Sequence, residues 1–239
     1  MSRPDLSGKI ALITGASKGI GAAVALGLAE CGAHVIATGR TIGALEELDD
    51  KIQAANNGQP ATLLPLDLGR LDEVDKIGPT IAERFGRLDI LIGNAGILGP
   101  LSPVGHVKPQ DWEKVFKINF MANIRLVRTV EPLLRLSDAP RVLFTTSAIA
   151  DDTPAYWSPY ASSKAALNAF MRTYAAENIS NKTMRINAIH PGAVATNMLE
   201  DAFPGGAPFA VKQPIDVVDD FLALVAPDCA KHGEIVKLA

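Results

Sequence analysis

Tyr160 and Lys164 lie four residues apart in a segment with helical periodicity, so their side chains are expected on one face of a helix. A tyrosine hydroxyl, with an ordinary pKa of about 10, is a weak acid by itself, but a neighbouring ammonium favours the phenolate and lowers that pKa. The pair could therefore exchange a proton near neutral pH. Taken alone, the spacing is more typical of an ordinary amphipathic surface pair, so its meaning depends on its surroundings.

Ser147 precedes Tyr160 by 13 residues and directly follows a predicted strand, Arg141–Thr146. Open α/β sheets bind ligands at the carboxyl ends of their strands. A serine hydroxyl there could hydrogen-bond a carbonyl oxygen and hold it against the phenol, or it could merely cap the strand end. No G-x-S-x-G surrounds it, which argues against a hydrolase nucleophile. The four histidines are scattered without metal-ligand spacing, so no metal site is predicted.

A glycine-rich turn, Thr14–Gly21, joins a predicted strand to a predicted helix. Gly15 would permit a tight turn, whereas Gly19 and Gly21 would let backbone approach a pyrophosphate and let the helix pack on the strand. The free N–H groups of the helix N-terminus would attract phosphate. The spacing differs from G-x-G-x-x-G and lacks the Gly-Lys-Ser/Thr of a P-loop. A turn that only connects a strand to a helix is the structural alternative.

Arg40 follows the second predicted strand, His34–Thr38, where NAD-preferring Rossmann domains carry an acidic residue that holds the ribose 2′-hydroxyl. The nearest downstream carboxylate here is Glu46. Arg40 and Lys18 are instead cationic, and both would attract a 2′-phosphate. The sequence therefore favours NADP(H) over NAD(H), with a solvated surface arginine as the alternative.

The elements that must position these residues alternate between apolar strands and amphipathic helices. Further strands are predicted at Lys9–Thr14, Ala61–Leu66, Leu88–Gly93, Thr183–His190 and Glu234–Leu238. Helices are predicted at Ile20–Glu30, Gly43–Ala55, Leu71–Phe85, Gln110–Leu136, Ser158–Asn178 and Asp216–Val225, with Pro132 bending or breaking the fourth of them late. This alternation predicts a single Rossmann-like, doubly wound parallel sheet of about seven strands with helices on both faces.

Residues 1–239 are expected to form one dinucleotide-binding and catalytic domain, because neither a linker nor an internal repeat is found. The segment Pro191–Pro214 is rich in Gly, Pro and Ala and only weakly periodic, so we expect a loop, with a short substrate lid at about residues 193–213.

Composition limits the remaining function classes. The 23 basic and 26 acidic residues give a net charge of −3, without a basic stretch suited to nucleic acid or to a membrane surface. No segment approaches the roughly 18 consecutive apolar residues of a membrane span. Cys31 and Cys229 form no disulfide framework, and Met1–Lys9 has no apolar core of a signal peptide. We therefore expect a cytoplasmic protein.

With these residues the chain resembles a short-chain dehydrogenase/reductase, in an NADP-preferring branch similar to 3-oxoacyl-carrier-protein reductases. The resemblance runs from Gly8 to about Pro214. Five motifs agree in order and spacing: Thr14–Gly21, Asp67-Leu68, Asn94-Ala95-Gly96, Ser147 with Tyr160 and Lys164, and Pro191-Gly192 with Thr196.

The resemblance implies a role for each matching residue. Tyr160 would be the catalytic acid/base, Lys164 would lower its pKa and bind the nicotinamide ribose, and Ser147 would orient the substrate carbonyl. Asn119 would hold a water in the proton relay by distorting its helix; a polar residue inside a helix is otherwise ordinary. The implied cofactor-binding residues are Gly15, Ser17, Lys18, Gly19, Ile20, Gly21, Arg40, Asp67, Leu68, Asn94, Ala95, Gly96, Tyr160, Lys164, Pro191, Gly192, Val194 and Thr196.

The expected activity is interconversion of a carbonyl and an alcohol by hydride transfer, on a substrate with an apolar body that could be of 3-oxoacyl type. The substrate pocket is assigned to Leu98, Ile149, Trp157, Met198 and Phe203, with core packing as an equal alternative for Trp157. The segment after Thr196 and the carboxyl end are short for the family, which would leave the pocket less closed.

Two alternatives remain open. One is an NAD-dependent alcohol dehydrogenase that uses the same site, and the other is a non-catalytic nucleotide-sensing protein of the same fold. The resemblance also implies a homo-oligomer, a dimer or tetramer, formed through Gln110–Leu136 and Ser158–Asn178.

Overall fold

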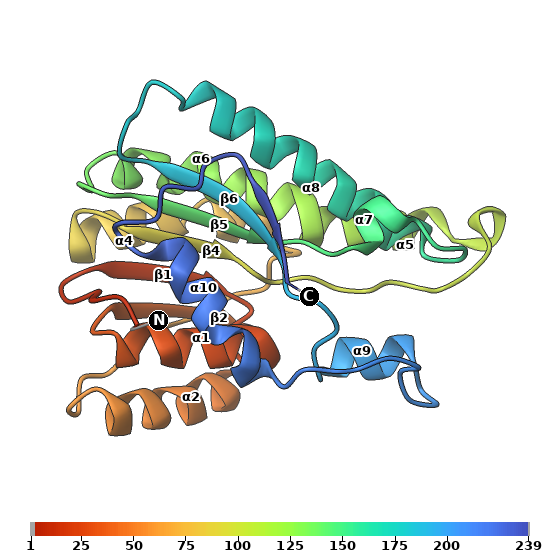
Figure 1. Cartoon of the computed structure of the whole chain (residues 1–239), viewed down its shortest axis with the longest axis horizontal. Coiled ribbons are helices and arrows are strands. Elements are labelled where there is room, and N and C mark those ends of the chain that lie inside the picture. Colours follow the sequence, from red (N-terminus) through yellow and green to blue (C-terminus); the bar gives the residue numbers. More distant parts are fainter. Residues whose placement is uncertain (1–2, 239) are drawn as a thin grey trace.

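Seven strands pair in parallel to form one sheet in the computed structural model, which describes residues 3–238 (Figure 1). The strands are β1 (Ile10–Thr14), β2 (His34–Gly39), β3 (Thr62–Pro65), β4 (Ile90–Gly93), β5 (Arg141–Thr145), β6 (Arg185–His190) and β7 (Ile235–Lys237). Their order across the sheet is β3-β2-β1-β4-β5-β6-β7. The predicted Rossmann-like fold class is confirmed.

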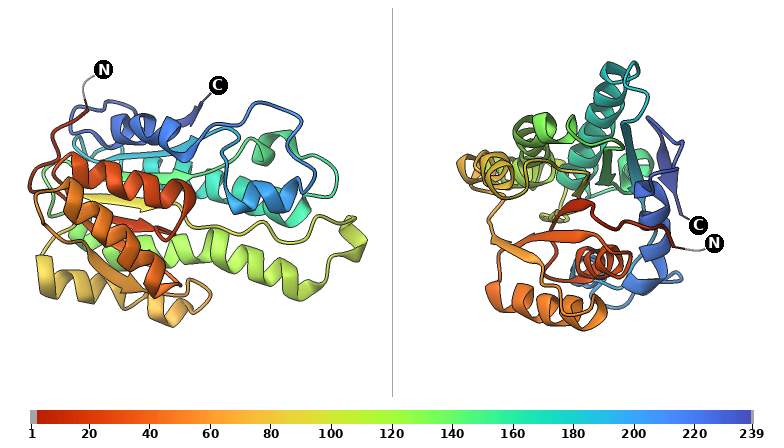
Figure 2. Two further views of the ribbon diagram at one scale, coloured as in Figure 1. Left: turned by 90° about the horizontal axis from the view of Figure 1, so that it is seen from below. Right: turned by 90° about the vertical axis from the view of Figure 1, so that its left-hand side faces the viewer.

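Helices cover both faces of the sheet (Figures 1 and 2). One face carries α1 (Gly19–Glu30), α2 (Ile42–Ala55) and α10 (Val218–Val225), which share a hydrophobic core. The opposite face carries α4 (Ile77–Phe85), α6 (Ala122–Leu134) and α8 (Ser158–Glu177), which share a second core. Within residues 3–238, no helix is both long enough and apolar enough to cross a membrane.

Strand β1 shows why the strands are apolar on both faces. Ala11 and Ile13 pack in the core beneath α1, whereas Leu12 packs in the core beneath α6. Successive side chains of a strand point to opposite faces, and helices exclude water from both faces of this sheet. The strands therefore read as nearly continuous apolar runs.

The order of the strands reverses between β1 and β4. The chain passes from β1 outward to β2 and β3, and then returns to place β4 on the other side of β1. Parallel strands bring all of their carboxyl ends to one edge of the sheet, and the reversal opens a crevice at that edge. The glycine-rich turn after β1 and the Asn94–Gly96 segment after β4 flank this point.

Two predicted helices are interrupted, for different reasons. The helix predicted at 71–85 divides into α3 (Leu71–Val74) and α4, and Pro79 is accommodated because it lies in the first turn of α4, where its missing N–H is not required. The helix predicted at 110–136 comprises α5 (Pro109–Phe116), a π-helical turn η2 (Lys117–Met121) and α6. Pro132 lies inside α6, which ends two residues later at Leu134.

Short helices that the sequence analysis did not predict flank the carboxyl edge of the sheet. They are η1 (Val104–His106), α7 (Ile149–Asp152) and α9 (Asn197–Ala202), and a fourth, η3 (Pro214–Val217), precedes α10. The expected loop over Pro191–Pro214 thus contains a helix, because the Thr196 side chain caps it by accepting a hydrogen bond from the Leu199 N–H.

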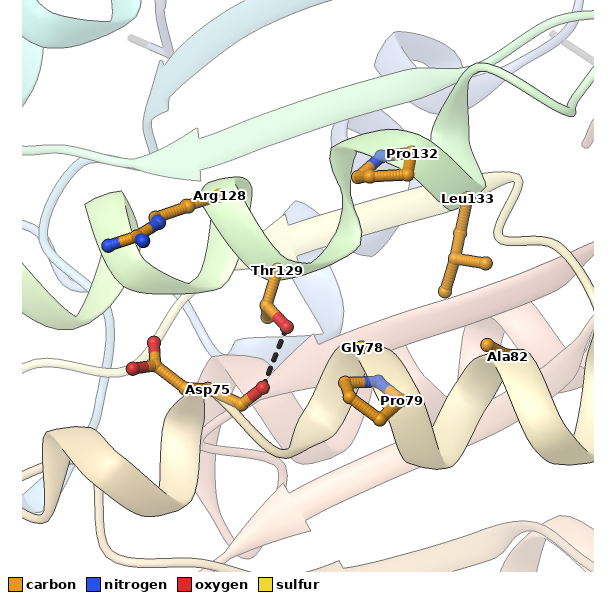
Figure 3. Close-up of a pocket in the computed structure, with 8 residues that line it drawn as sticks. All are labelled: Asp75, Gly78, Pro79, Ala82, Arg128, Thr129, Pro132 and Leu133. Atoms are coloured by element: carbon orange, nitrogen blue, oxygen red, sulfur yellow. Dashed lines mark hydrogen bonds between the residues drawn. The ribbon is translucent and has the colours of Figure 1, made fainter.

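Helices α4 and α6 approach closely at Gly78 (Figure 3). A Cβ atom at Gly78 would lie 2.1 Å from the backbone oxygen of Thr129. The hydroxyl of Thr129 donates a 2.8 Å hydrogen bond to the backbone oxygen of Asp75, and the Asp75 carboxylate pairs with Arg125. The α4–α6 contact therefore requires glycine at position 78.

We predict that Gly78→Ala lowers the free energy of unfolding by about 1–3 kcal/mol, because the added methyl group forces the two helices apart. Gly43→Ala is the matched control: it also changes a helical glycine, but nothing lies within 4 Å of the added Cβ. That substitution should stabilise the protein by up to about 1 kcal/mol. Urea unfolding of both variants measures the effect, and equal stability of the two would contradict the assignment.

Candidate active site

A cleft of about 660 Å³ opens at the carboxyl edge of the sheet, across the reversal between β1 and β4. Every residue predicted to bind the cofactor lines it, as do Ser147 and the five predicted pocket residues. Asn119 is the one predicted site residue that lies beneath the lining, fully buried in η2. The structure thus brings together residues that are spread along the sequence from Gly15 to Phe203.

The glycine-rich turn leaves no room for side chains at two of its glycines. Gly15 has a φ of +69°, and a Cβ there would lie 3.0 Å from Cα of Ala95. A Cβ at Gly21 would lie only 2.2 Å from the backbone oxygen of Gly15. Helix α1 begins at Gly19, so its unpaired N–H groups face the cleft beside this turn. Such a backbone cradle at a helix N-terminus suits a pyrophosphate.

Thr14 fixes the two sides of the crevice to each other, and the sequence analysis assigned it no role. Its hydroxyl accepts hydrogen bonds from the N–H groups of Asn94, at 3.0 Å, and Ala95, at 3.1 Å. The Asn94 side-chain amide donates a 3.0 Å hydrogen bond to the Thr14 backbone oxygen. These bonds hold the Asn94–Gly96 segment against the phosphate turn.

Tyr160 and Lys164 occupy one buried face of α8, as their spacing predicts. The Lys164 ammonium donates a 2.7 Å hydrogen bond to the backbone oxygen of Thr145, at the end of β5. It lies 5.8 Å from the centre of the Tyr160 ring. Ser147 follows β5 on the same side of the cleft, so all three side chains meet where β5 ends and α8 begins.

Burial dominates the ionisation of this pair. It raises the pKa of Tyr160 to about 12, an effect that the neighbouring Ser147 hydroxyl only partly offsets. Burial also lowers the pKa of Lys164 to about 8. The spacing predicts that Lys164 lowers the tyrosine pKa, whereas in the protein alone desolvation raises this pKa. Tyr160 is therefore a neutral phenol at neutral pH and can donate a proton.

Asn119 lies in the π-helical turn and binds the loop above it. Its side-chain oxygen accepts a 2.8 Å hydrogen bond from the Ile97 N–H, and its amide donates to the Ile97 oxygen at 2.9 Å and to Ser163 Oγ at 3.0 Å. Ser163 in turn donates a 2.8 Å hydrogen bond to the backbone oxygen of Tyr160. Asn119 thereby connects the loop after β4 to the helix that carries Tyr160.

Asn123 is a second buried amide that the sequence analysis missed. Its side-chain nitrogen donates a 2.9 Å hydrogen bond to the backbone oxygen of Asn119. In an α-helix that oxygen would accept from the backbone N–H four residues later, a pattern that the π-helical turn interrupts. The side chain of Asn123 supplies a replacement donor, which stabilises the distortion at Asn119.

The far end of the cleft is cationic. Arg40 and Lys18 both line it and are exposed, and within residues 3–238 neither forms an ion pair. Asp67, also exposed, accepts a hydrogen bond from the Gly69 N–H, whereas Leu68 is buried at the cleft wall. The guanidinium of Arg40 and the ammonium of Lys18 can therefore pair with an anionic ligand.

The segment after β6 closes the opposite side. Gly192 has a φ of +81°, and Val194 and Thr196 follow it along the cleft. A Cβ at Gly19 would lie 3.1 Å from Cγ2 of Thr196, so this segment reaches the phosphate turn. His190, which the sequence analysis did not assign, also lines the cleft, and burial lowers its pKa so that its ring is neutral near pH 7.

The remaining wall is apolar. The predicted pocket residues Leu98, Ile149, Trp157, Met198 and Phe203 all line it, and the structure adds Phe209. Trp157 is half-buried beside Tyr160 rather than enclosed in either core. Phe209 lies in a stretch with no periodicity, so no sequence signal pointed to it.

Comparison with known proteins places these features in a family. The model of the family "short chain dehydrogenase" matches residues 9–205. The oxidoreductase YciK of Escherichia coli (strain K12) is 35% identical over 224 residues, which cover 93% of this chain and 88% of that protein. Versicolorin reductase stcU of Emericella nidulans is 34% identical over 232 residues, covering 93% of this chain and 83% of that protein.

Solved structures agree over nearly the whole chain. A short chain dehydrogenase from Pseudomonas syringae superposes with a TM-score of 0.94 at 33% identity, covering 99% of this chain and 97% of that one. A short chain dehydrogenase from Escherichia coli CFT073, solved in complex with NADPH, superposes with a TM-score of 0.93 at 33% identity, covering 99% of both chains.

The low pKa of Lys164 predicts how the free energy of unfolding depends on pH. In the folded protein this pKa is about 8, below the 10.5 of an exposed lysine, so the unfolded chain binds more protons between those values. The burial cost is therefore fully present below about pH 8 and disappears as pH rises through 10.5. Lys164→Met should raise the free energy of unfolding at pH 7 by roughly 3 kcal/mol, less the lost hydrogen bond to Thr145.

Denaturant unfolding of the wild type and Lys164→Met at pH 7, 8, 9 and 10 measures this difference. It should shrink steadily above pH 8, although the variant is expected to lose activity. If the difference in the free energy of unfolding did not depend on pH, burial would not destabilise the charged form of Lys164. Lys182→Met, at a position outside the cleft, is the control and should show no such trend.

Proposed function

Because the chain belongs to the short chain dehydrogenase family, we propose that this oxidoreductase reduces a carbonyl to an alcohol with NADPH, with Tyr160 as the proton donor. The observation that carries the proposal is the position of the Tyr160 phenol, which is buried beside Lys164 in a cleft whose other end is the glycine-rich turn. The reverse oxidation would use the same residues, so the proposal concerns the preferred direction and cofactor.

The residues of the cleft fit a nicotinamide dinucleotide. The turn from Gly15 to Gly21 has no space for a Cβ atom at Gly15 or Gly21 and presents a helix N-terminus to a pyrophosphate. Asn94, Ala95 and Gly96 would line the middle of the groove, and Asp67 and Leu68 would contact the adenine. On the opposite wall, Pro191, Gly192, Val194 and Thr196 would contact the nicotinamide end.

Selectivity for NADP(H) over NAD(H) is proposed to come from Arg40 and Lys18, with Ser17 and Ile20 completing that end of the cleft. A guanidinium binds a phosphate through two parallel hydrogen bonds, and an ammonium adds a point charge. The structures solved with NADPH and with NADP belong to relatives that share 33% of their sequence with this chain, which supports the same choice here.

When bound, the reduced nicotinamide supplies the hydride, and the residues of this chain orient the carbonyl and move the proton. Ser147 would hydrogen-bond the carbonyl oxygen and hold it against the phenol of Tyr160, which donates its proton to that oxygen. Lys164 has one N–H engaged with Thr145, so its other donors are available for ribose hydroxyls. Asn119, in the π-helical turn η2, would hold a water of the proton relay.

Several properties of the whole molecule belong to the same proposal. Residues 1–239 would act as one domain, with residues 193–213, which contain α9, as a short lid over the substrate. The outer faces of α6 and α8 would form a homodimer or homotetramer, as the family resemblance implies. The two free cysteines, Cys31 and Cys229, are consistent with the expected cytoplasmic location.

Replacing Arg40 by alanine should weaken NADPH binding by about 10- to 100-fold, because a charge-assisted contact is lost, and should change NADH binding by less than about twofold. Titration of wild type and Arg40→Ala with each reduced cofactor, followed by nicotinamide fluorescence, measures both constants. Arg172→Ala, an exposed arginine outside the cleft, is the control. Tighter binding of NADH than NADPH by the wild type would overturn the cofactor assignment.

Tyr160→Phe removes the proposed proton donor and keeps the ring. We expect kcat/KM for carbonyl reduction to fall by at least about 100-fold, the usual contribution of a general acid. NADPH affinity should change by less than about twofold, since the ring and its packing remain. Retention of wild-type kcat/KM would show that another group protonates the product, whereas loss of NADPH affinity would indicate a structural role for the hydroxyl.

A further inference from the structure

The substrate half of the cleft is walled by aromatic rings from two segments that are distant in sequence from each other. Trp157 precedes α8, Phe203 follows α9, and Phe209 lies six residues further on. The Trp157 ring centre lies 6.1 Å from that of Tyr160 and 6.0 Å from that of Phe203. The Phe203 and Phe209 rings are 5.3 Å apart and nearly perpendicular. The proton donor is thus the first ring of a continuous aromatic row.

These rings are incompletely covered by the protein. Phe209 is 47% exposed although it lines the cleft, and Trp157 is only half-buried. Exposed aromatic area in a cleft is costly in water and is recovered when a flat apolar ligand covers it. The rings that line the cleft therefore have exposed apolar area that a ligand could cover.

The charged residues that line the cleft do not favour an anionic substrate. Among the described lining residues, the cations Lys18 and Arg40 and the carboxylate of Asp67 lie at the cofactor end, and Lys164 lies beside Tyr160. The one charged lining residue of the lid is Asp201, a carboxylate on α9. The described lid residues that line the cleft supply one carboxylate and no cation, so they offer no ion-pair partner to a substrate carboxylate or phosphate, and an uncharged substrate is favoured.

Backbone hydrogen bonds hold the segment that carries Trp157. Tyr156 has a φ of +75°, a left-handed conformation that is strained for a bulky residue. Its backbone oxygen accepts a 3.0 Å hydrogen bond from the Ser102 N–H, and the Trp157 oxygen accepts a 2.9 Å hydrogen bond from Ala161 in α8. Because strained residues persist where neighbouring structure determines them, the Trp157 ring has a defined position relative to Tyr160.

We propose that the substrate is an uncharged, planar aryl ketone, and that Trp157, Phe203 and Phe209 are the residues that select it. This inference rests on the proposed carbonyl reductase function. The carbonyl carbon gains a hydride from NADPH and its oxygen gains the proton of Tyr160, so the ketone becomes a secondary alcohol and NADPH becomes NADP⁺. The flat ring system extends from the carbonyl along the aromatic row, in offset or edge-to-face contact.

Two ketones with the same carbon skeleton test the proposal: 1-tetralone, which has one aromatic ring, and trans-1-decalone, which is fully saturated. Steady-state reduction with NADPH should give a kcat/KM for tetralone at least about 10-fold higher, carried by a lower KM, since each ring contact is worth roughly 2- to 12-fold. Conjugation makes tetralone the less reactive ketone, so intrinsic chemistry acts against this result.

Substitution of the rings separates selection from folding. Trp157→Leu, Phe203→Leu and Phe209→Leu should each lower the tetralone-to-decalone ratio by roughly 2- to 12-fold through KM, with NADPH affinity unchanged. Phe85→Leu is the control, because Phe85 contacts His34 away from the cleft and should leave the ratio unchanged. Similar ratios in the wild type and all four variants would overturn the inference, as would preferred reduction of the linear ketone ethyl 3-oxohexanoate.

A binding measurement distinguishes failure of this inference from failure of the proposed function. The chain has two tryptophans, so Trp112→Phe leaves Trp157 as the sole indole fluorophore. Tetralone, with or without NADP⁺, should quench its fluorescence, and decalone should not. Quenching without turnover would support the aromatic site and contradict the reductase function. Reduction of both ketones without selective quenching would keep the reductase function and overturn the aromatic site.

Discussion

The ammonium of Lys164 is a positive charge enclosed by protein, with the backbone oxygen of Thr145 as its hydrogen-bond acceptor in the described structure. Removing a charge from water is costly unless hydrogen bonds or opposite charges replace the lost solvation. A single carbonyl compensates only in part, as the lowered pKa of Lys164 shows. The strand that ends at Thr145, the helix that carries Lys164, and the loop at Gly96 must therefore remain in fixed positions around it.

The parallel sheet makes that arrangement possible. Parallel strands end at one edge, so the carboxyl ends of β1, β4, β5 and β6 meet there although more than 170 residues separate the first from the last. Polar groups at these ends then bind one another: Thr14 holds Asn94, and Asn119 holds the loop after β4. The two cores beneath them consist of closely packed apolar side chains on either face of the sheet, and this packing holds the strands that carry the edge.

The two ends of the cleft differ in whether backbone or side chains line them. The phosphate turn at the cofactor end is largely backbone, because the glycines at 15, 19 and 21 have no side chains to cover it. Backbone donors bind the same phosphates in every member of such a fold and give little choice between substrates. The substrate end is made of side chains from the segments before α8 and after α9, where sequence can vary without disturbing the sheet. Selectivity for the substrate therefore depends on Trp157, Phe203 and Phe209 rather than on the fold.

The sequence by itself determined whatever depends on neighbours along the chain. Alternating apolar strands and amphipathic helices predicted the sheet, the glycine spacing predicted the phosphate turn, and the four-residue interval placed Tyr160 and Lys164 on one helical face. These features were predictable because backbone sterics and helical periodicity act over a few residues.

Only the tertiary structure decided the features that depend on contacts between distant segments. Pro132 was accommodated within α6, Asn123 replaced a helical hydrogen bond, and Phe209 joined the aromatic row through Phe203. The direction of the Tyr160 pKa was also decided there, because desolvation depends on everything packed around the phenol and not on the one lysine that the spacing revealed. Burial is a property of the whole fold, so no local pattern could have given its sign.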